Sequence, residues 1–176
     1  MRRSVRTLAF VFFGLALLLA HSMLGRIAPL HPFVPNLLLP VVVYLGVAPN
    51  LPLLRGALAA FVLGYLLDLF SGNRMGLETF VCVATFMISR GAGLRLFMRN
   101  PGFQAALLFV VALVAGGTTL ALRAIFSKPP PFPAGTAGET AVTLVAPALA
   151  TALVSPLVFA GLQRVDAAIG RRREET

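Results

Sequence analysis

The sequence predicts an all-α polytopic membrane protein with about six transmembrane helices. Of its 176 residues, 58% are hydrophobic and 12% are charged, whereas a soluble domain carries about 25% charged and about 45–50% apolar residues. The apolar residues also gather in long runs, which are separated by short segments rich in proline, glycine and arginine. No soluble core of this size could bury so much apolar surface, so we predict a single integral membrane domain over residues 1–176.

The first two runs differ in length. A transmembrane helix needs about 20 residues, with a range of about 17–25. Residues 7–25 follow an arginine-rich N-terminus and resemble a signal peptide, but no Ala-x-Ala cleavage pattern follows them, so we predict a retained helix. Residues 36–48 form a shorter run that contains Pro40. A proline there should remove one helix hydrogen bond and kink the helix.

The remaining runs predict four further spans. Residues 71–74, with the sequence Ser-Gly-Asn-Arg, have the composition of a turn, so the spans on either side should form a helical hairpin. A proline-rich segment follows the fifth run and favours extended rather than helical geometry. The predicted spans are residues 7–25, 36–48, 54–70, 76–89, 102–122 and 140–162.

The distribution of basic residues predicts the orientation. Loops on the cytoplasmic side of a membrane carry an excess of Lys and Arg. With six spans and a cytoplasmic N-terminus, the outer segments hold only 4 of the 15 basic residues. Those four are Arg26, Arg74, Arg123 and Lys128, and the other 11 fall in inner segments. Both termini are therefore predicted to lie in the cytoplasm.

Asp68 is the most informative residue of the chain, because it lies near the end of the apolar run 56–70. An aspartate in the middle of a membrane costs about 2.5–3.5 kcal/mol on insertion scales, so it needs a partner, an aqueous edge or a function. One interpretation is a polar helix end that Asn73, Arg74 or water satisfies. The other is a contact with a partner helix or a neighbouring span.

Small residues recur every four positions around Asp68. Such a stripe lets a second backbone come close, and the spacing leaves open whether the neighbour is a span of this chain or another protein. Asp68 itself interrupts the stripe, and replacing it with Ala is expected to impair partner assembly more than membrane insertion. The small residues are Gly56, Ala60, Gly64, Gly72 and Gly76.

The other polar residues do not form a catalytic or metal-binding pattern. Glu78 lies four residues after Arg74 and is expected to pair with it along the helix. His21 and His31 lack the further ligands that a zinc site needs, and the single cysteine, Cys82, lies in an apolar run as a small core residue. No Gly-x-Ser-x-Gly or His-Glu-x-x-His motif is present. We therefore predict no catalysis, no cofactor and no metal.

The net charge of +9 has a membrane explanation. No basic helix interleaved with aromatic residues is present to follow a phosphate backbone, so nucleic acid is not an expected partner. The basic tail chiefly sets topology, and it would also attract anionic lipids at about 1 kcal/mol per residue. It could equally dock an acidic cytoplasmic partner. The tail residues are Arg171, Arg172 and Arg173.

Residues 34–44 and 64–76 resemble the MreD family of rod shape-determining membrane proteins. That family has a Pro-Asp-Leu-like entry to an early span and then a Gly-x-x-x-Asp-x-x-x-Gly-x-x-x-Gly core. Gly64, Asp68, Gly72 and Gly76 match the core residue by residue. Asn36 stands where an acid is common, so a role for that charge is not carried over.

The resemblance implies a function and a set of partners. MreD is a non-enzymatic inner-membrane member of the elongation machinery, which works with the bitopic protein MreC. Through MreC it works with RodA, the elongation penicillin-binding protein and the actin-like MreB filament. The resemblance therefore implies a scaffold or regulator of cell-wall elongation. Membrane lipids and a second copy of the chain are further expected partners.

The resemblance also implies a fold and, with it, an alternative function. The MreD fold is similar to that of the vitamin-binding membrane components of energy-coupling-factor transporters. Ala16 and Ala20 match an Ala-x-x-x-Ala pattern that is typical of the first helix of those components. Such a component should line an outer pocket with aromatic and hydrogen-bonding groups. The outer segments offer few of these groups, so the scaffold is the favoured interpretation.

Overall fold

The computed structural model describes residues 2–27, 35–48, 51–71, 76–91, 101–126 and 137–171, and these segments form helices without a strand. The prediction of an all-helical chain is confirmed for them. The helices are α1 (Arg2–Ile27), α2 (Leu38–Val47), α3 (Leu53–Ser71), α4 (Leu77–Gly91), α5 (Pro101–Phe126) and α6 (Ala137–Arg171).

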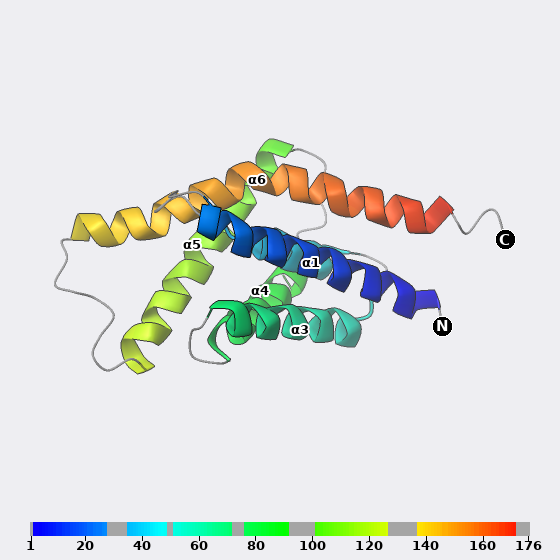
Figure 1. The fold of residues 1–176 in the computed structure, drawn as a ribbon, viewed down its shortest axis with the longest axis horizontal. Coiled ribbons are helices and arrows are strands. Elements are labelled where there is room, and N and C mark those ends of the chain that lie inside the picture. Colours follow the sequence, from blue (N-terminus) through cyan, green and yellow to red (C-terminus); the bar gives the residue numbers. More distant parts are fainter. Residues whose placement is uncertain are drawn as a thin grey trace.

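Three of the six helices are long and apolar enough to cross a membrane, over Leu53–Phe70, Gly102–Ile125 and Ala141–Ala168. The first two helices contain shorter apolar segments, Thr7–Ala20 and Leu38–Val47. A crossing of the whole bilayer by all six helices remains a prediction, as does the transporter-component fold. Figure 1 shows the start of α1 and the end of α6 on the same side of the molecule.

The short helix α2 is the centre of the bundle. It contacts every other helix, and the side chains of Val41, Val42 and Leu45 have no exposed surface. A helix that is apolar on all sides is expected to be buried. Its ten residues rise about 15 Å, which is half the thickness of the hydrocarbon core. The length of α2 therefore does not support the predicted full span over residues 36–48.

The predicted kink at Pro40 is wrong. Pro40 is the third residue of α2, so it lies in the first helical turn, where backbone N–H groups have no partner within the helix. A proline at this position costs no helix hydrogen bond. Its fixed φ instead suits the start of a helix.

The last helix, α6, continues through two prolines, Pro147 and Pro156. Pro156 lacks the N–H group that would bond the carbonyl of Ala152, four residues earlier. The hydroxyl of Ser155 donates a 2.7 Å hydrogen bond to that same carbonyl. The neighbouring side chain therefore replaces the bond that the proline removes, as occurs in membrane helices.

Candidate functional site

The buried carboxylate of Asp68, near the end of α3, binds the start of α4. Its two oxygens accept hydrogen bonds from the backbone N–H groups of Gly76 (2.9 Å), Glu78 (2.9 Å) and Thr79 (3.0 Å). The Thr79 hydroxyl donates a fourth bond of 2.6 Å. Asp68 is only 1% exposed. One side chain thus satisfies three of the backbone donors that a helix N-terminus leaves without partners.

This arrangement is a helix cap supplied from another helix. An aspartate usually caps the helix that it immediately precedes, whereas Asp68 lies eight residues before Gly76 and on the preceding helix. The negative charge also faces the positive end of the α4 dipole. Gly76 has a φ of +97°, which side-chain-bearing residues rarely adopt. A Cβ there would meet nothing within 4 Å, so backbone conformation rather than space requires this glycine.

The small-residue stripe of α3 faces α4 within the same chain. A Cβ on Gly64 would lie 2.7 Å from the Cα of Thr79, and a Cβ on Gly56 would lie 2.6 Å from the Phe86 ring. Ala60, between them, has no exposed surface. Gly64 therefore lets the α3 backbone approach the first turn of α4, which is the approach that brings Asp68 to its donors.

A second capping contact joins α2 to α6. The Asn36 side-chain oxygen accepts hydrogen bonds from the backbone N–H groups of Leu38 (3.1 Å) and Leu39 (3.4 Å). The Asn36 backbone N–H donates to the Thr151 hydroxyl at 2.9 Å, and that hydroxyl donates to the carbonyl of Pro147 at 2.7 Å. An amide oxygen caps a helix as a carboxylate does, so this position does not need a negative charge to start α2.

Glu78 pairs with a residue on another helix. Its carboxylate lies 3.8 Å from the Arg123 guanidinium near the end of α5. Arg74, the expected partner, lies outside the described residues, as do Asn73, Gly72, His31, Arg172 and Arg173. Arg171 is the last residue of α6. Cys82 is buried in the core, as a small apolar residue would be.

Comparison with protein families identifies the chain. The model of the family described as rod shape-determining protein MreD matches residues 1–132 of the 176, which include Asn36, Asp68 and Gly76. The chain belongs to the MreD family. No curated protein and no solved structure matched it. The family match gives no support to the vitamin-binding alternative.

Two residues of this site, Thr79 and Thr151, were absent from the sequence predictions, and Arg123 was predicted only as a basic residue of an outer segment. Thr79 binds Asp68, Thr151 binds Asn36, and Arg123 pairs with Glu78. Threonine is favoured at helix N-caps and turns, but Thr79 is the third residue of α4, so this preference does not indicate its bond to Asp68. No local signal points to Thr151, whose partner lies 115 residues away.

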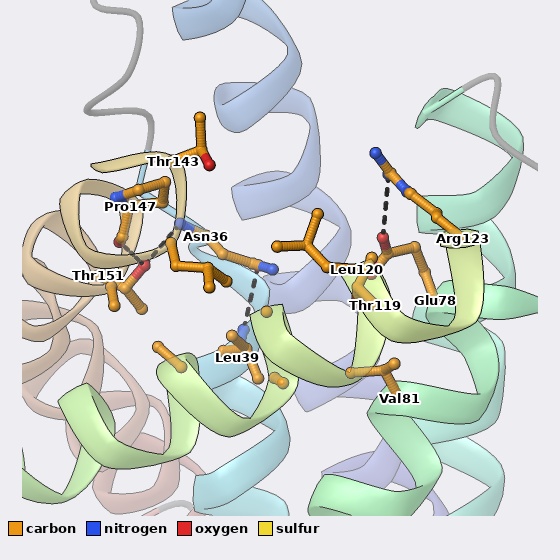
Figure 2. A pocket seen from close by; sticks show the side chains of 15 residues that line it. Asn36, Leu39, Glu78, Val81, Thr119, Leu120, Arg123, Thr143, Pro147 and Thr151 are labelled. Atoms are coloured by element: carbon orange, nitrogen blue, oxygen red, sulfur yellow. Dashed lines mark hydrogen bonds and ion pairs between the residues drawn. The ribbon is translucent and has the colours of Figure 1, made fainter. Parts of the chain in front are cut away.

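A cavity of about 340 Å³ lies between the two capped helices and α5 and α6 of this MreD family member (Figure 2). Asn36, Glu78, Arg123 and Thr151 lie on its wall together with apolar residues. Among the described residues, no group of three or more His, Cys, Asp or Glu side chains could hold a metal ion. The cavity therefore has on its wall the cap of α2, Asn36, and a residue from the capped start of α4, Glu78.

Proposed function

We propose that this chain is a non-enzymatic membrane scaffold or regulator of cell-wall elongation and rod shape, which acts in complex with an MreC-like bitopic protein. The match of the MreD family model to residues 1–132 carries this proposal. The matched segment includes the whole α3–α4 hairpin with its Asp68 cap. Rod-shape determination is the role that the family's own description states.

The bonding of the polar residues supports a structural rather than a catalytic role. Both carboxylate oxygens of Asp68 accept hydrogen bonds from the start of α4. The side-chain oxygen of Asn36 accepts hydrogen bonds from the start of α2. A general base must lie within hydrogen-bond reach of the proton that it abstracts, whereas Asp68 is only 1% exposed. These groups instead hold helices in fixed positions, as a scaffold requires.

The packing of α3 restricts where a partner helix could bind. The face with Gly56 and Gly64 lies against α4, so it cannot also receive a partner while the hairpin is closed. The opposite face of α3 exposes large apolar side chains, which include the stacked rings of Phe61 and Tyr65. In this proposal, partner contacts use exposed faces, and the small residues and Asp68 maintain the bundle that presents them.

The wider assembly follows from the family. The proposed partners beyond the MreC-like protein are RodA, the elongation penicillin-binding protein and MreB, in the inner membrane of a bacterium. Both termini would be cytoplasmic, and the common side of the α1 start and the α6 end in Figure 1 supports this topology. Arg171 at the end of α6 would then lie near anionic lipids or an acidic cytoplasmic partner.

Co-purification combined with complementation tests the proposal. The tagged chain would be expressed in place of the native gene and purified from membranes in mild detergent, with the accompanying proteins identified by mass spectrometry. We expect an MreC-like protein and cell-wall synthases, and rounded cells when the gene is depleted. Rod-shaped depleted cells without an MreC-like partner would overturn the proposal. Recovery of paired ATPases and a coupling subunit would identify a transporter component instead.

A further inference from the structure

The cavity, which α2, α4, α5 and α6 surround, has an apolar body and a polar rim, with Asn36 and Thr151 on one side and Glu78 and Arg123 on the other (Figure 2). Its apolar lining includes Leu39, Val81, Ala115 and Ala148, all of which belong to one buried cluster. Its volume of about 340 Å³ lies at the small end of the range of about 300–1,000 Å³ for small-molecule sites. An apolar lining with a few polar groups is the composition that such sites share.

The Asn36 amide presents donors to this cavity. Its oxygen accepts hydrogen bonds from the first N–H groups of α2, so the other end of the planar amide, the NH₂ group, must face away from α2. Figure 2 shows the Asn36 side chain extending from beside Thr151 toward Leu120 on α5. The cap that fixes α2 therefore also fixes two N–H donors at the cavity wall.

Arg123 adds a second donor at the rim. Its Nε atom is buried and has no hydrogen-bond partner among the described residues, and its side chain is about one-third exposed (35%). A buried donor without a partner is costly unless another molecule supplies an acceptor. The nearby Glu78 carboxylate offsets the guanidinium charge, so the rim favours a single acceptor head over a multiply charged anion.

The position of the cavity indicates how a ligand would reach it. The wall formed by α5 is the least buried of the three long spans, with 17% of its residues buried against 39% in α3 and α6. The cavity therefore lies behind the candidate span with the most exposed surface, which would face lipid in a membrane. A hydrocarbon chain can reach such a site from the bilayer while its head group stays at the polar rim.

We propose that this cavity binds a single-chain amphiphile whose head is a hydrogen-bond acceptor, a carboxylate or an ester carbonyl, with the Asn36 amide as the donor to that head. The hydrocarbon chain lies against the apolar lining between α5 and α6. This site needs no partner protein, so its test is independent of the proposed role in cell-wall elongation.

Two adjacent glycines supply a matched pair of variants. Gly116 lines the cavity, and a Cβ there would lie 3.2 Å from the Leu144 side chain. Gly117, the next residue of α5, does not line the cavity, and a Cβ there would meet nothing within 4 Å. Gly116→Leu should fill the cavity, whereas Gly117→Leu makes the same chemical change outside it.

Asn36→Asp separates capping from donation. Aspartate retains an oxygen that can cap α2, but it replaces the NH₂ donors with an acceptor that repels a carboxylate or carbonyl. We expect this variant to stay folded and to lose about tenfold in affinity for the amphiphile, as the loss of one good hydrogen bond implies. This variant tests whether Asn36 donates to the head group, and it does so even if Gly116→Leu fails to fold.

Photo-crosslinking of the full chain in nanodiscs of phosphatidylethanolamine and phosphatidylglycerol tests the proposal. The probe is palmitic acid with a diazirine in its chain, decanoic acid is the competitor, and the matching diazirine alcohol is the comparison. We expect saturable adducts on the α5 and α6 residues that line the cavity, with about tenfold fewer in Gly116→Leu and Asn36→Asp than in Gly117→Leu. Equal labelling of the two glycine variants, or adducts confined to lipid-facing residues, would overturn the site. Equal labelling by the acid and the alcohol would overturn recognition of the head.

Discussion

Replacing Asp68 tests whether the cap that joins α3 to α4 holds the hairpin together. Asp68→Asn keeps the size of the side chain but turns one acceptor oxygen into an NH₂ donor. If the remaining oxygen keeps its bonds to Gly76 and Thr79, the new donor faces the backbone N–H of Glu78. Two donors then oppose each other in a buried site. Asp68→Ala removes every acceptor from three N–H groups and one hydroxyl.

The size of the effect follows from the bonds that are lost. A hydrogen bond to a charged group contributes about 1.5–3 kcal/mol, and a buried donor without a partner costs about 1–3 kcal/mol. The terms do not add fully, because Gly76 is exposed and water can reach its N–H group. We expect Asp68→Asn to lower the free energy of opening the hairpin by about 2 kcal/mol and Asp68→Ala by about 3–4 kcal/mol.

The single cysteine provides the assay. Cys82 is 3% exposed and lies on α4 at the contact with Gly64, so a fluorogenic maleimide can react with its thiol only when the hairpin opens. With a labelling rate proportional to the open population, a loss of about 2 kcal/mol raises the rate about 30-fold. The purified full chain in detergent micelles is suitable. Equal labelling rates in wild type and Asp68→Ala would refute the conclusion that the cap stabilises the hairpin.

Further substitutions test the other contacts. Gly64→Ala should speed thiol labelling because its Cβ would lie 2.7 Å from the Thr79 Cα, whereas Gly117→Ala, which meets nothing, should leave the rate unchanged or lower it. Gly76→Ala should lower the free energy of unfolding by about 1–2 kcal/mol, since the φ of Gly76 is +97°. An unchanged midpoint temperature of thermal unfolding would contradict that strain. Ser155→Ala leaves the Ala152 carbonyl beside Pro156 unbonded and should cost about 1 kcal/mol in the same measurement.

The helical runs could be predicted from the sequence, because apolar length and turn composition are local properties. The predicted hairpin between residues 54–70 and 76–89 corresponds to α3 and α4. The predicted kink at Pro40 was wrong because the start of α2 was not known from the sequence. The sequence shows that a proline is present, but its effect depends on whether the helix begins two residues or ten residues earlier.

The partners of the polar residues could not be predicted. The sequence indicated that Asp68 is important, because a carboxylate in an apolar run is costly to bury and needs a partner. The identity of that partner depends on how two helices pack. The Glu78 interaction shows the same limit. Helix spacing predicts pairs within a helix, whereas the structure pairs Glu78 with Arg123, which lies on α5.

The two caps share one physical origin, which is that short helices begin where their first N–H groups are partly buried. α2 and α4 have 10 and 15 residues, whereas α3 has 19 and α6 has 35. Some of the first N–H groups of such a helix, such as that of the buried Thr79, are out of reach of water and need an acceptor within the protein. Asp68 on α3 supplies the acceptor for α4, and Thr151 on α6 holds Asn36, which supplies it for α2. The long helices therefore position the short ones through single polar side chains, and loss of either cap should loosen a short helix before it affects a long one.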